Sequence, residues 1–466
     1  MSRQILRPYQ ADALEGIREE LRGGRRRVLL VSPTGSGKTT IAAEMVRSAV
    51  SRGNRVLFLA HRKELIDQCS ARLDGCSVPH GVIMAGHPRY QPLEPVQVAS
   101  IPTLVRREPP PADLVVLDEA HHARARTYER ILEHYPRAPV VGLSATPWRI
   151  DGKGLGELFE AVVVAARVRS LIEAGHLVSY SGFAYDHPSL ASVDKRGSDY
   201  DQRGLELVMG GRKLIGNIVG QWQRHASNAR TVVFACTVAH SREVVERFRA
   251  AGVTAEHLDG ETPKEERAAI LARLASGRTR VVSNVAVLTE GWDCPAVEVC
   301  ILARPTLSVG LYLQMVGRVL RPSPGKAQAR IHDHAGCILR HGLPDEDRNY
   351  SLDADVRSPA AKEKAPGVRR CKACLAVYAS DLPACPVCGV APVVKQRRIQ
   401  EVDDAAVQAV RLEEIRRVEA PVEVRRRYFE QQMELAKSRD YRPGWAAFRY
   451  KARFGAWPPR EWGVAA

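Results

Sequence analysis

A glycine-rich turn, "LLVSPTGSGKTT" (29–40), sets a lysine and two threonines directly after an apolar run. Glycines at such a turn let backbone N–H groups close around phosphate oxygens at the start of a helix. Lys38 is then placed for the β- and γ-phosphates of a nucleotide, and Thr39 for a magnesium ion. Ser32 stands where the usual pattern has its first glycine, so the pattern is missed by one position. The nucleotide-binding residues predicted here are Thr34, Gly35, Ser36, Gly37, Lys38, Thr39 and Thr40.

An acidic pair follows a second apolar run in "VVLDEAHHA" (115–123). Carboxylates at the end of a buried strand cost free energy unless a cation is bound. We expect Asp118 to hold magnesium through water and Glu119 to orient and polarise the attacking water. A surface turn is the alternative, but the "LVVL" that precedes the pair argues against exposure.

Four cysteines are bunched in "CKACLAVYASDLPACPVCG" (371–389) as C-x₂-C, ten residues, C-x₂-C. Four thiolates at this spacing can surround one Zn²⁺ tetrahedrally, and a closed set of this kind has a structural role. Disulfides or a redox pair are the alternatives. The predicted zinc ligands are Cys371, Cys374, Cys385 and Cys388.

The elements that must position these residues alternate between strand-like and helical patterns. Val/Leu-rich strands are predicted at 27–32, 55–60, 96–100, 113–118 and 140–146, with helices at 39–53 and 62–73 between them. Near-continuous apolar strands that alternate with helices predict a parallel sheet covered on both faces. The pattern restarts near residue 229, so we expect two α/β domains in tandem. The later strands are expected at 230–236, 253–259, 279–285 and 297–303, with helices near 238–251, 263–276 and 309–320.

Composition limits the class of protein. The formal net charge is +16 and the pI is about 9.6, which favours polyanionic partners, either nucleic acid or an acidic membrane surface. No apolar stretch is long enough to span a bilayer, and the N-terminal residues carry no apolar signal region. We therefore expect a cytoplasmic or nucleoid-associated protein that does not use a membrane.

The phosphate loop and "DEAHH" together resemble the superfamily 2 helicases and translocases of the DEAD/DEAH class. The other motifs of that superfamily follow in order over residues 1–340. The matching segments are "LRPYQADAL" (6–14), "LAHRKELIDQ" (59–68), "VASIPTL" (98–104), "LSATPWR" (143–149), "VVFACT" (232–237), "NVAVLTEGWDCP" (284–295) and "YLQMVGRVLRP" (312–322). The resemblance implies two RecA-like domains that use ATP and Mg²⁺.

Residue roles are carried over from the resemblance onto matching positions. Gln10 would contact adenine, and Gln314, Arg318 and Arg321 would reach the nucleotide from the second domain, the arginines as fingers on the γ-phosphate. Gly291 and Asp293, on the second domain, would couple nucleotide state to the strand-binding face. Ser144 and Thr146 would do so from the first domain.

The C-terminal stretch "YRPGWAAFRYKARFGAWPPREWG" (441–463) interleaves aromatic and cationic residues. Such a stretch can stack bases and neutralise phosphates. The interpretation that we favour is structural: Trp445, Phe448 and Ala452 would form the buried face of a short helix. A tail of this kind after four cysteines resembles the RadD-like branch of bacterial and phage superfamily 2 proteins, which is associated with DNA repair and recombination.

We therefore predict an ATP-dependent helicase or translocase that prefers DNA to RNA. An RNA helicase, the motor subunit of a restriction-type complex and a nonenzymatic binding module are the alternatives. The zinc element and the tail could also recruit a protein partner. The predicted domains are 1–165 (RecA-like, ATP-binding), 166–345 (RecA-like, C-terminal), 346–370 (linker), 371–390 (zinc-binding element) and 391–466 (helical basic and aromatic tail).

Overall fold

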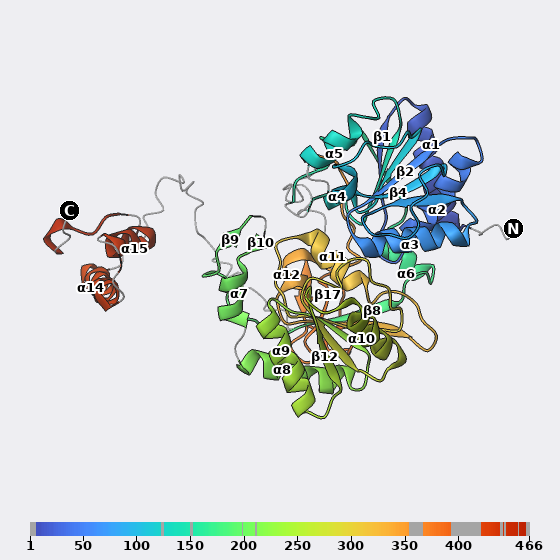
Figure 1. Cartoon of the computed structure of the whole chain (residues 1–466). Coiled ribbons are helices and arrows are strands. Elements are labelled where there is room, and N and C mark those ends of the chain that lie inside the picture. Colours follow the sequence, from blue (N-terminus) through green and yellow to red (C-terminus); the bar gives the residue numbers. More distant parts are fainter. Residues whose placement is uncertain are drawn as a thin grey trace, which may run out of the picture. The chain divides into compact units, whose positions relative to one another are not determined.

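The computed structural model divides into two compact units, Met1–Val393 and Val394–Ala466, and each is described by itself. The larger unit contains two α/β lobes, each built around its own parallel sheet (Figure 1). None of the described helices combines the length and the apolar character that crossing a membrane requires. The residues that the structure describes are 6–122, 125–149, 152–197, 199–209, 212–353, 367–392, 421–438, 441, 444–454 and 456–462.

The first sheet has seven parallel strands in the order β3-β4-β2-β5-β6-β1-β7. Its strands are β1 (Arg27–Val31), β2 (Val56–Ala60), β3 (His80–Ile83), β4 (Val96–Ser100), β5 (Leu114–Leu117), β6 (Val140–Ser144) and β7 (Ala161–Val164).

Helices cover both faces of this sheet because its strands are apolar on both sides. On β1, Val28 and Leu30 join one core cluster and Leu29 and Val31 join the other. The first cluster includes α1 (Pro8–Arg22), α2 (Lys38–Val50) and α3 (Lys63–Gly75), and the second includes α4 (Ile101–Leu104) and α5 (Ala125–Leu132).

The second sheet has eight strands in the order β12-β13-β11-β14-β15-β8-β17-β16. Only β17 runs opposite to the others, so its pairings with β8 and β16 are antiparallel. Its strands are β8 (Ser179–Ala184), β11 (Thr231–Phe234), β12 (Ala255–Leu258), β13 (Val281–Asn284), β14 (Val299–Leu302), β15 (Gln328–Asp333), β16 (Val368–Arg370) and β17 (Ala376–Ala379).

Alternation also divides the core of this lobe. Val232 and Phe234 pack in the cluster of α10 and α11, whereas Val233 packs with α8 and α9. The helices of the lobe are α6 (Val168–Glu173), α7 (Gln202–Met209), α8 (Arg212–Ala226), α9 (Val238–Ala250), α10 (Lys264–Ser276), α11 (Val309–Gly317) and α12 (Cys337–His341), and β9 (Lys195–Arg196) pairs with β10 (Asp199–Tyr200). The prediction of two tandem RecA-like α/β domains is confirmed.

The four-cysteine segment is part of the second sheet. β17 pairs with β8 through Ala376 and Val377, and Phe183 of β8 packs against the cysteines. β16 occupies the end of the range predicted as a linker, and residues 354–366 of that range lie outside the described residues. The predicted domain boundaries themselves stay predictions.

The C-terminal unit contains α14 (Val422–Ser438), α15 (Trp445–Phe454) and a short 3₁₀ turn (Arg460–Trp462). Ala446, Ala447 and Tyr450 of α15 are buried against Phe429 of α14. The buried face predicted for this helix is wrong at Phe448, which is 66% exposed, because the partner helix covers the neighbouring face instead. The predicted tail residues 393–420 lie outside the described residues.

Candidate nucleotide site between the two sheets

The phosphate loop connects β1 to α2, and α2 begins at Lys38. Gly35 and Gly37 have φ angles of +88° and +87°, a backbone conformation that other residues rarely adopt. A Cβ at position 37 would lie 2.6 Å from Nε2 of Gln10, so the loop also needs glycine for space. The sequence therefore builds this turn for local geometric reasons.

Tyr9 and Gln10 hold the loop from α1. The Tyr9 hydroxyl and Gln10 Nε2 both donate to the Ser36 carbonyl oxygen, at 2.5 and 3.0 Å. Lys38 Nζ donates to the carbonyl oxygen of Ser32 at 3.1 Å, and burial lowers the pKa of Lys38. Ser32, which replaces the usual first glycine, also bonds through Oγ with Ser36 Oγ.

The two threonines after the lysine differ in their surroundings. The Thr40 hydroxyl accepts a hydrogen bond from Arg72 at 2.5 Å, so it supports α3 packing in this structure. Thr39 lies one residue after Lys38, in the first turn of α2, where the predicted magnesium ligand has to be. Thr34 contacts the other lobe: a Cβ at Gly317 would lie 2.6 Å from Thr34 Cβ, so this close approach requires glycine.

The acidic pair lies at the carboxyl end of β5, and both side chains are buried. Burial and the neighbouring Glu119 carboxylate raise the pKa of Asp118 to about 7. Two buried carboxylates side by side favour a bound cation, which would replace the proton on Asp118. Glu119 has a φ of +47°, an unfavourable conformation for a non-glycine residue that is typical of functional positions.

The two predicted arginine fingers lie just after α11 but make different contacts. The Arg318 guanidinium donates to the carbonyl oxygens of Thr289 and Trp292 at 2.6–3.0 Å. Arg321 lies over the phosphate loop, where a Cβ on Gly35 would be 3.0 Å from its Cγ. Arg321 also pairs with Asp293. Only Arg321 of these two is thus seen against the loop.

Gly291 makes its contacts away from the phosphate loop. Its carbonyl oxygen accepts a hydrogen bond from Gln68 of α3 at 2.6 Å, and its φ is +65°. Asp293 reaches the site only through its ion pair with Arg321. Gly291 therefore connects the two lobes, whereas Asp293 contacts Arg321 within the second lobe.

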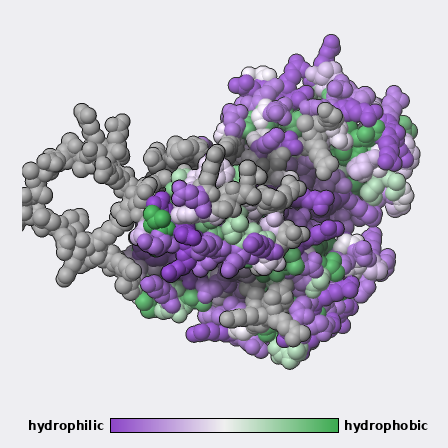
Figure 2. All heavy atoms as spheres, turned by 90° about the vertical axis from the view of Figure 1, so that its left-hand side faces the viewer, coloured by the Kyte–Doolittle hydropathy of each residue, from purple (hydrophilic) through white to green (hydrophobic). Residues whose placement is uncertain are grey.

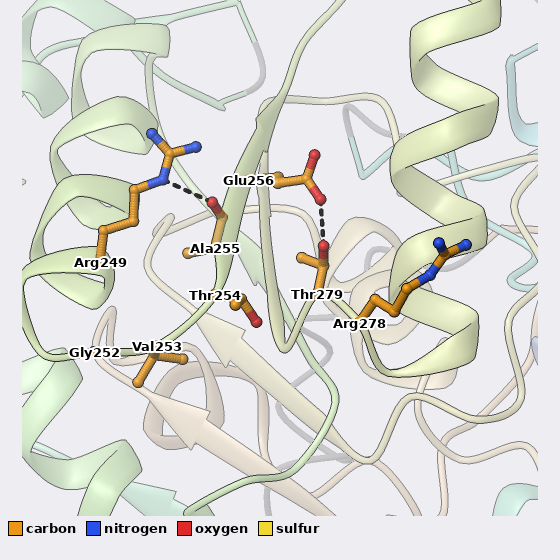
Figure 3. A pocket seen from close by; sticks show the side chains of 8 residues that line it. All are labelled: Arg249, Gly252, Val253, Thr254, Ala255, Glu256, Arg278 and Thr279. Atoms are coloured by element: carbon orange, nitrogen blue, oxygen red, sulfur yellow. Dashed lines mark hydrogen bonds between the residues drawn. The ribbon is translucent and has the colours of Figure 1, made fainter.

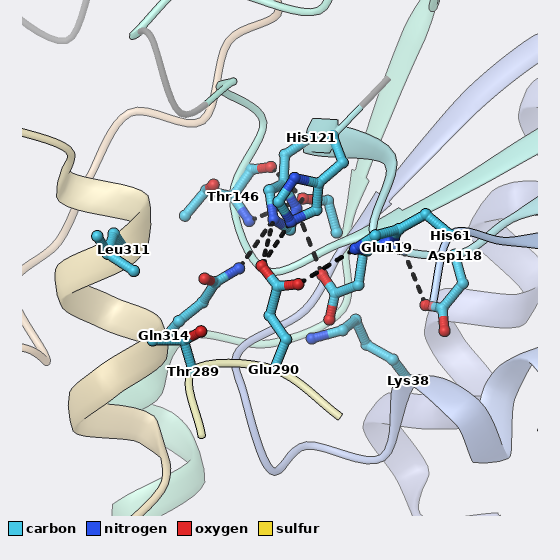
Figure 4. A network of polar contacts seen from close by, with 12 residues as sticks. Lys38, His61, Asp118, Glu119, His121, Thr146, Thr289, Glu290, Leu311 and Gln314 are labelled. Atoms are coloured by element: carbon cyan, nitrogen blue, oxygen red, sulfur yellow. Dashed lines mark hydrogen bonds and ion pairs between the residues drawn. The ribbon is translucent and has the colours of Figure 1, made fainter. Parts of the chain in front are cut away.

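A buried polar network joins the two sheets next to the acidic pair (Figure 4). His121 Nδ1 lies 3.1 Å from Ser144 Oγ and 3.3 Å from Glu119 Oε2. On the other side of the ring, Nε2 accepts from the Gln314 amide at 2.9 Å. Ser144 Oγ also donates to the Thr146 carbonyl oxygen. The sequence-predicted Gln314, Ser144 and Thr146 are therefore in one chain of contacts.

Glu290 and His121 are residues of this network that the sequence did not single out. Glu290 lies between β13 and β14 in the second lobe and faces His61, Arg62 and His122 of the first. Burial raises the pKa of Glu290, but hydrogen bonds from the histidines outweigh burial and hold the net pKa well below its ordinary value. Its place in "TEGWDCP", one residue before Gly291, was the only signal available.

The four cysteines are brought together as predicted. Their sulfur atoms all lie within 4.8 Å of one another, with Cys371 and Cys388 at 3.6 Å and Cys374 and Cys385 at 3.6 Å. The backbone N–H of Cys374 helps to lower the pKa of Cys371 to about 7, which favours the thiolate that binds metal. The set fits one tetrahedral ion.

A shallow cavity of about 500 Å³ lies at the β12 edge of the second sheet (Figure 3). Its polar groups are already engaged, since Arg249 donates to the Ala255 carbonyl oxygen and Glu256 binds Arg273 and Thr279. None of the predicted nucleotide or metal residues lines it.

Two family models match the chain. The type III restriction enzyme res subunit matches residues 3–149, and the helicase conserved C-terminal domain matches residues 212–323. The two matched ranges contain the phosphate loop, the acidic pair and the two arginines that follow α11, and so include residues of both lobes.

Three relatives of known sequence are similar over most of this chain. A 51.5 kDa protein of a Lactococcus phage is 31% identical over 78% of this chain and 77% of its own length. The mitochondrial ATP-dependent helicase irc3 of Schizosaccharomyces pombe is 32% identical over 74% of this chain, but the match spans only 61% of that protein. The DNA 3′-5′ translocase XPB2 of Sulfurisphaera tokodaii is 24% identical over 69% of this chain and 80% of its own.

A solved structure shares the fold. The fragment of an HsdR subunit of a type I restriction enzyme from Vibrio vulnificus superposes with a TM-score of 0.59 and 23% identity. The superposition covers 74% of this chain and 67% of that fragment.

Proposed function

The chain belongs to the superfamily 2 helicases and hydrolyses ATP, and on this premise we propose that it is a DNA-dependent translocase. The observation that carries the proposal is the meeting of two lobes at one phosphate loop. Gly317 and Arg321 of the second lobe lie against Thr34 and Gly35 of the first. A nucleotide held there would contact residues of both lobes, so its hydrolysis can drive their relative movement.

The cleft residues suit phosphoryl transfer in which the protein positions groups and stabilises charge. Lys38 would exchange the Ser32 carbonyl oxygen for phosphate oxygens, and Gln10 would contact adenine from α1. Bound Mg²⁺ would neutralise phosphate charge, and Thr39 and Asp118 are the residues that fit it. Glu119 would orient the attacking water.

Arginine supplies the remaining charge stabilisation. Arg321 already lies over the loop and would leave Asp293 for the γ-phosphate. Arg318 would have to release Thr289 and Trp292 to reach it, which would free the segment that carries Gly291. An arginine finger contributes ~10³–10⁵ in rate to such reactions. Release of this segment is how hydrolysis would be communicated to the bound strand.

DNA is the proposed track. The net charge of +16 favours a polyanion, and XPB2, one of the similar proteins, is named a DNA translocase. Figure 2 views the molecule from the left-hand side of Figure 1 and shows hydrophilic side chains over much of the described surface on that face. The four-cysteine element and aromatic tail support the RadD-like branch, and with it a role in DNA repair or recombination at the nucleoid.

A restriction-type motor is the second candidate. The res-subunit family model and the HsdR fold likeness favour it. In that case the four-cysteine element, with zinc bound to Cys371, Cys374, Cys385 and Cys388, and the tail would bind the other subunits.

The test is ATP hydrolysis measured alone and with single-stranded DNA, forked DNA or RNA at one fixed salt concentration, because phosphate contacts weaken steeply with salt. We expect stimulation by DNA and not by RNA. Lys38→Ala should abolish turnover because the loop then lacks its phosphate cation, whereas Lys264→Ala, which removes an exposed lysine at the start of α10 outside the helicase motifs, should retain it. Equal turnover with and without every nucleic acid would contradict the DNA track, and retained turnover in Lys38→Ala would contradict the loop assignment.

A further inference from the structure

A second group of metal-binding side chains lies between the two lobes. His61 follows β2, His122 ends the 3₁₀ turn Ala120–His122 after β5, and Glu290 follows β13. One ligand atom from each lies within 4.8 Å of the others. All three residues follow parallel strands of the two sheets. Figure 4 shows His61 and Glu290 close together in the polar network beside the acidic pair.

The distances between ligand atoms suit a single ion. His122 Nε2 is 2.5 Å from Glu290 Oε1, and His61 Nε2 is 3.4 Å from Glu290 Oε2. The two imidazole rings have centroids 4.4 Å apart. Ligands at zinc distances in a tetrahedral site are separated by ~3.3 Å. The three ligand atoms are therefore already close to the separations that one shared ion requires.

The group is sheltered, and its bonding is incomplete. The Glu290 side chain is only 4% exposed, and the histidine side chains are 21% and 20% exposed. His61 Nδ1 is shielded from solvent with no hydrogen-bond partner among the described residues. The nearest cation to the carboxylate is Arg62, at 3.5 Å and partly exposed. Glu290 Oε2 is also shielded from solvent with no hydrogen-bond partner among the described residues, so a dication would give this oxygen the partner that it lacks.

His121 is near but is not a ligand. Its Nε2 lies 3.6 Å from Glu290 but accepts the Gln314 amide, and its Nδ1 faces Ser144 and Glu119. Both of its ring nitrogens are therefore engaged. The donor set is two imidazoles and one carboxylate with a fourth position open.

We propose that His61, His122 and Glu290 form a site for a transition-metal dication, with Zn²⁺ as the best match, which joins the two lobes. Imidazole ligands suit zinc and its neighbours and are poor ligands for magnesium, so this site is distinct from the nucleotide magnesium. Two ligands come from one lobe and one from the other. An ion bound here fixes their separation and arrests the cycle of opening and closing that, on the function proposed above, drives movement.

Cobalt reports the site without relying on activity. Adding Co²⁺ to the full chain with its four-cysteine cluster intact should give d–d absorption for one extra equivalent, without the charge-transfer band of a cobalt thiolate. His61→Ala and Glu290→Gln should weaken this binding at least ~10-fold because each removes a ligand. His134→Ala removes an exposed histidine that bonds Arg130 in the same lobe, and it should bind cobalt as the unaltered chain does.

Calorimetric titration with Zn²⁺ measures affinity, and ATPase measured with zinc then tests arrest. We expect inhibition that a chelator reverses and that needs at least ~10-fold more zinc in His61→Ala. Equal cobalt binding in His61→Ala and the unaltered chain, or a thiolate band, would overturn the site. Full ATPase activity at saturating zinc would overturn the arrest. Because His61 is partly exposed, its variant decides the result even where Glu290→Gln fails to fold. An ATPase that DNA does not stimulate would contradict the proposed action on DNA and would leave the metal site untouched.

Discussion

The two candidate metal sites of this protein differ in how far apart their ligands lie in the sequence and in how many lobes supply them. The four cysteines come from 18 consecutive residues, 371–388, and all lie at one edge of the second sheet. His61, His122 and Glu290 span more than two hundred residues and come from two lobes. The first arrangement can only stabilise a local fold, whereas the second can sense whether two bodies are together.

Their surroundings differ as well. Cys371 and Cys385 are buried with Phe183 and Tyr378, so metal there is part of a core. Glu290 is buried among polar groups that also reach Gln314 and Glu119 of the nucleotide cleft. A local site with four thiolates is expected to be permanent, and a shared site with an open position is expected to be exchangeable.

The largest expected effect comes from removing a buried thiolate. Cys385→Ser should release zinc from the cysteine cluster, because binding by four thiolates at neutral pH contributes on the order of 10 kcal/mol to folding such elements. Backbone amides of β16 and β17 should then lose hydrogen-exchange protection, and metal content should fall. His134→Ala, which removes an exposed histidine of the first lobe, is the matched control and should leave both unchanged. Full zinc content in Cys385→Ser would contradict the cysteine assignment.

Chelation should separate the sites by rate. EDTA should remove metal from the His–His–Glu group roughly 100-fold faster than from the cysteines, because an open coordination position lets the chelator attack. Stopped-flow absorbance of cobalt in the His–His–Glu group, with zinc in the cysteines, measures the release rate from the first of these sites. The absorbance of cobalt substituted into the cysteine cluster measures the release rate from the second. Equal release rates would erase the distinction between an exchangeable and a permanent site.

The smallest expected effect is a loss of folding stability in acid, which sets the lowest pH at which metal binding can be measured. Burial lowers the pKa of His240 to about 4, of His334 to about 3 and of His341 to about 4, all in the second lobe. The unfolded chain therefore binds more protons than the folded one as the pH falls below about 6.5. Stability should therefore drop as the pH falls from 6.5 towards 4, because protons bind the unfolded chain and not the buried imidazoles.

Chemical denaturation at pH 7.5 and pH 5.5 measures this acid effect. His240→Gln should reduce the pH dependence, whereas the exposed His134→Gln should not. Metal release by acid should therefore be followed above pH 6.5, where unfolding of the second lobe does not contribute. A stability that is the same at both pH values would contradict the buried neutral state of these histidines.

Local features of the sequence predicted most of the fold. The Val/Leu runs at 27–32 and 230–236 became the central strands β1 and β11, because near-continuous apolar runs can only be buried between two helical layers. Strands β3, β7, β8, β15, β16 and β17 were not predicted. Some are only three or four residues long, and the six-residue β8 (SYSGFA) and β15 (QARIHD) contain too few apolar residues for a strand pattern. The buried face of α15 was misassigned at Phe448 because the side that α14 covers depends on how the two helices pack, which the spacing of residues within α15 does not encode.

The sequence by itself determined the groups whose chemistry depends on close spacing. Gly35, Gly37 and Lys38 form a phosphate loop, and the four cysteines form a metal cluster, because a few backbone dihedral angles set their geometry. Only the tertiary structure decided that Glu290 meets His61 and His122, that Arg321 lies over Gly35, and that Arg318 is bound to Thr289. Those contacts join residues that only the folding of two separate sheets brings together, and no local spacing encodes the distance between two lobes.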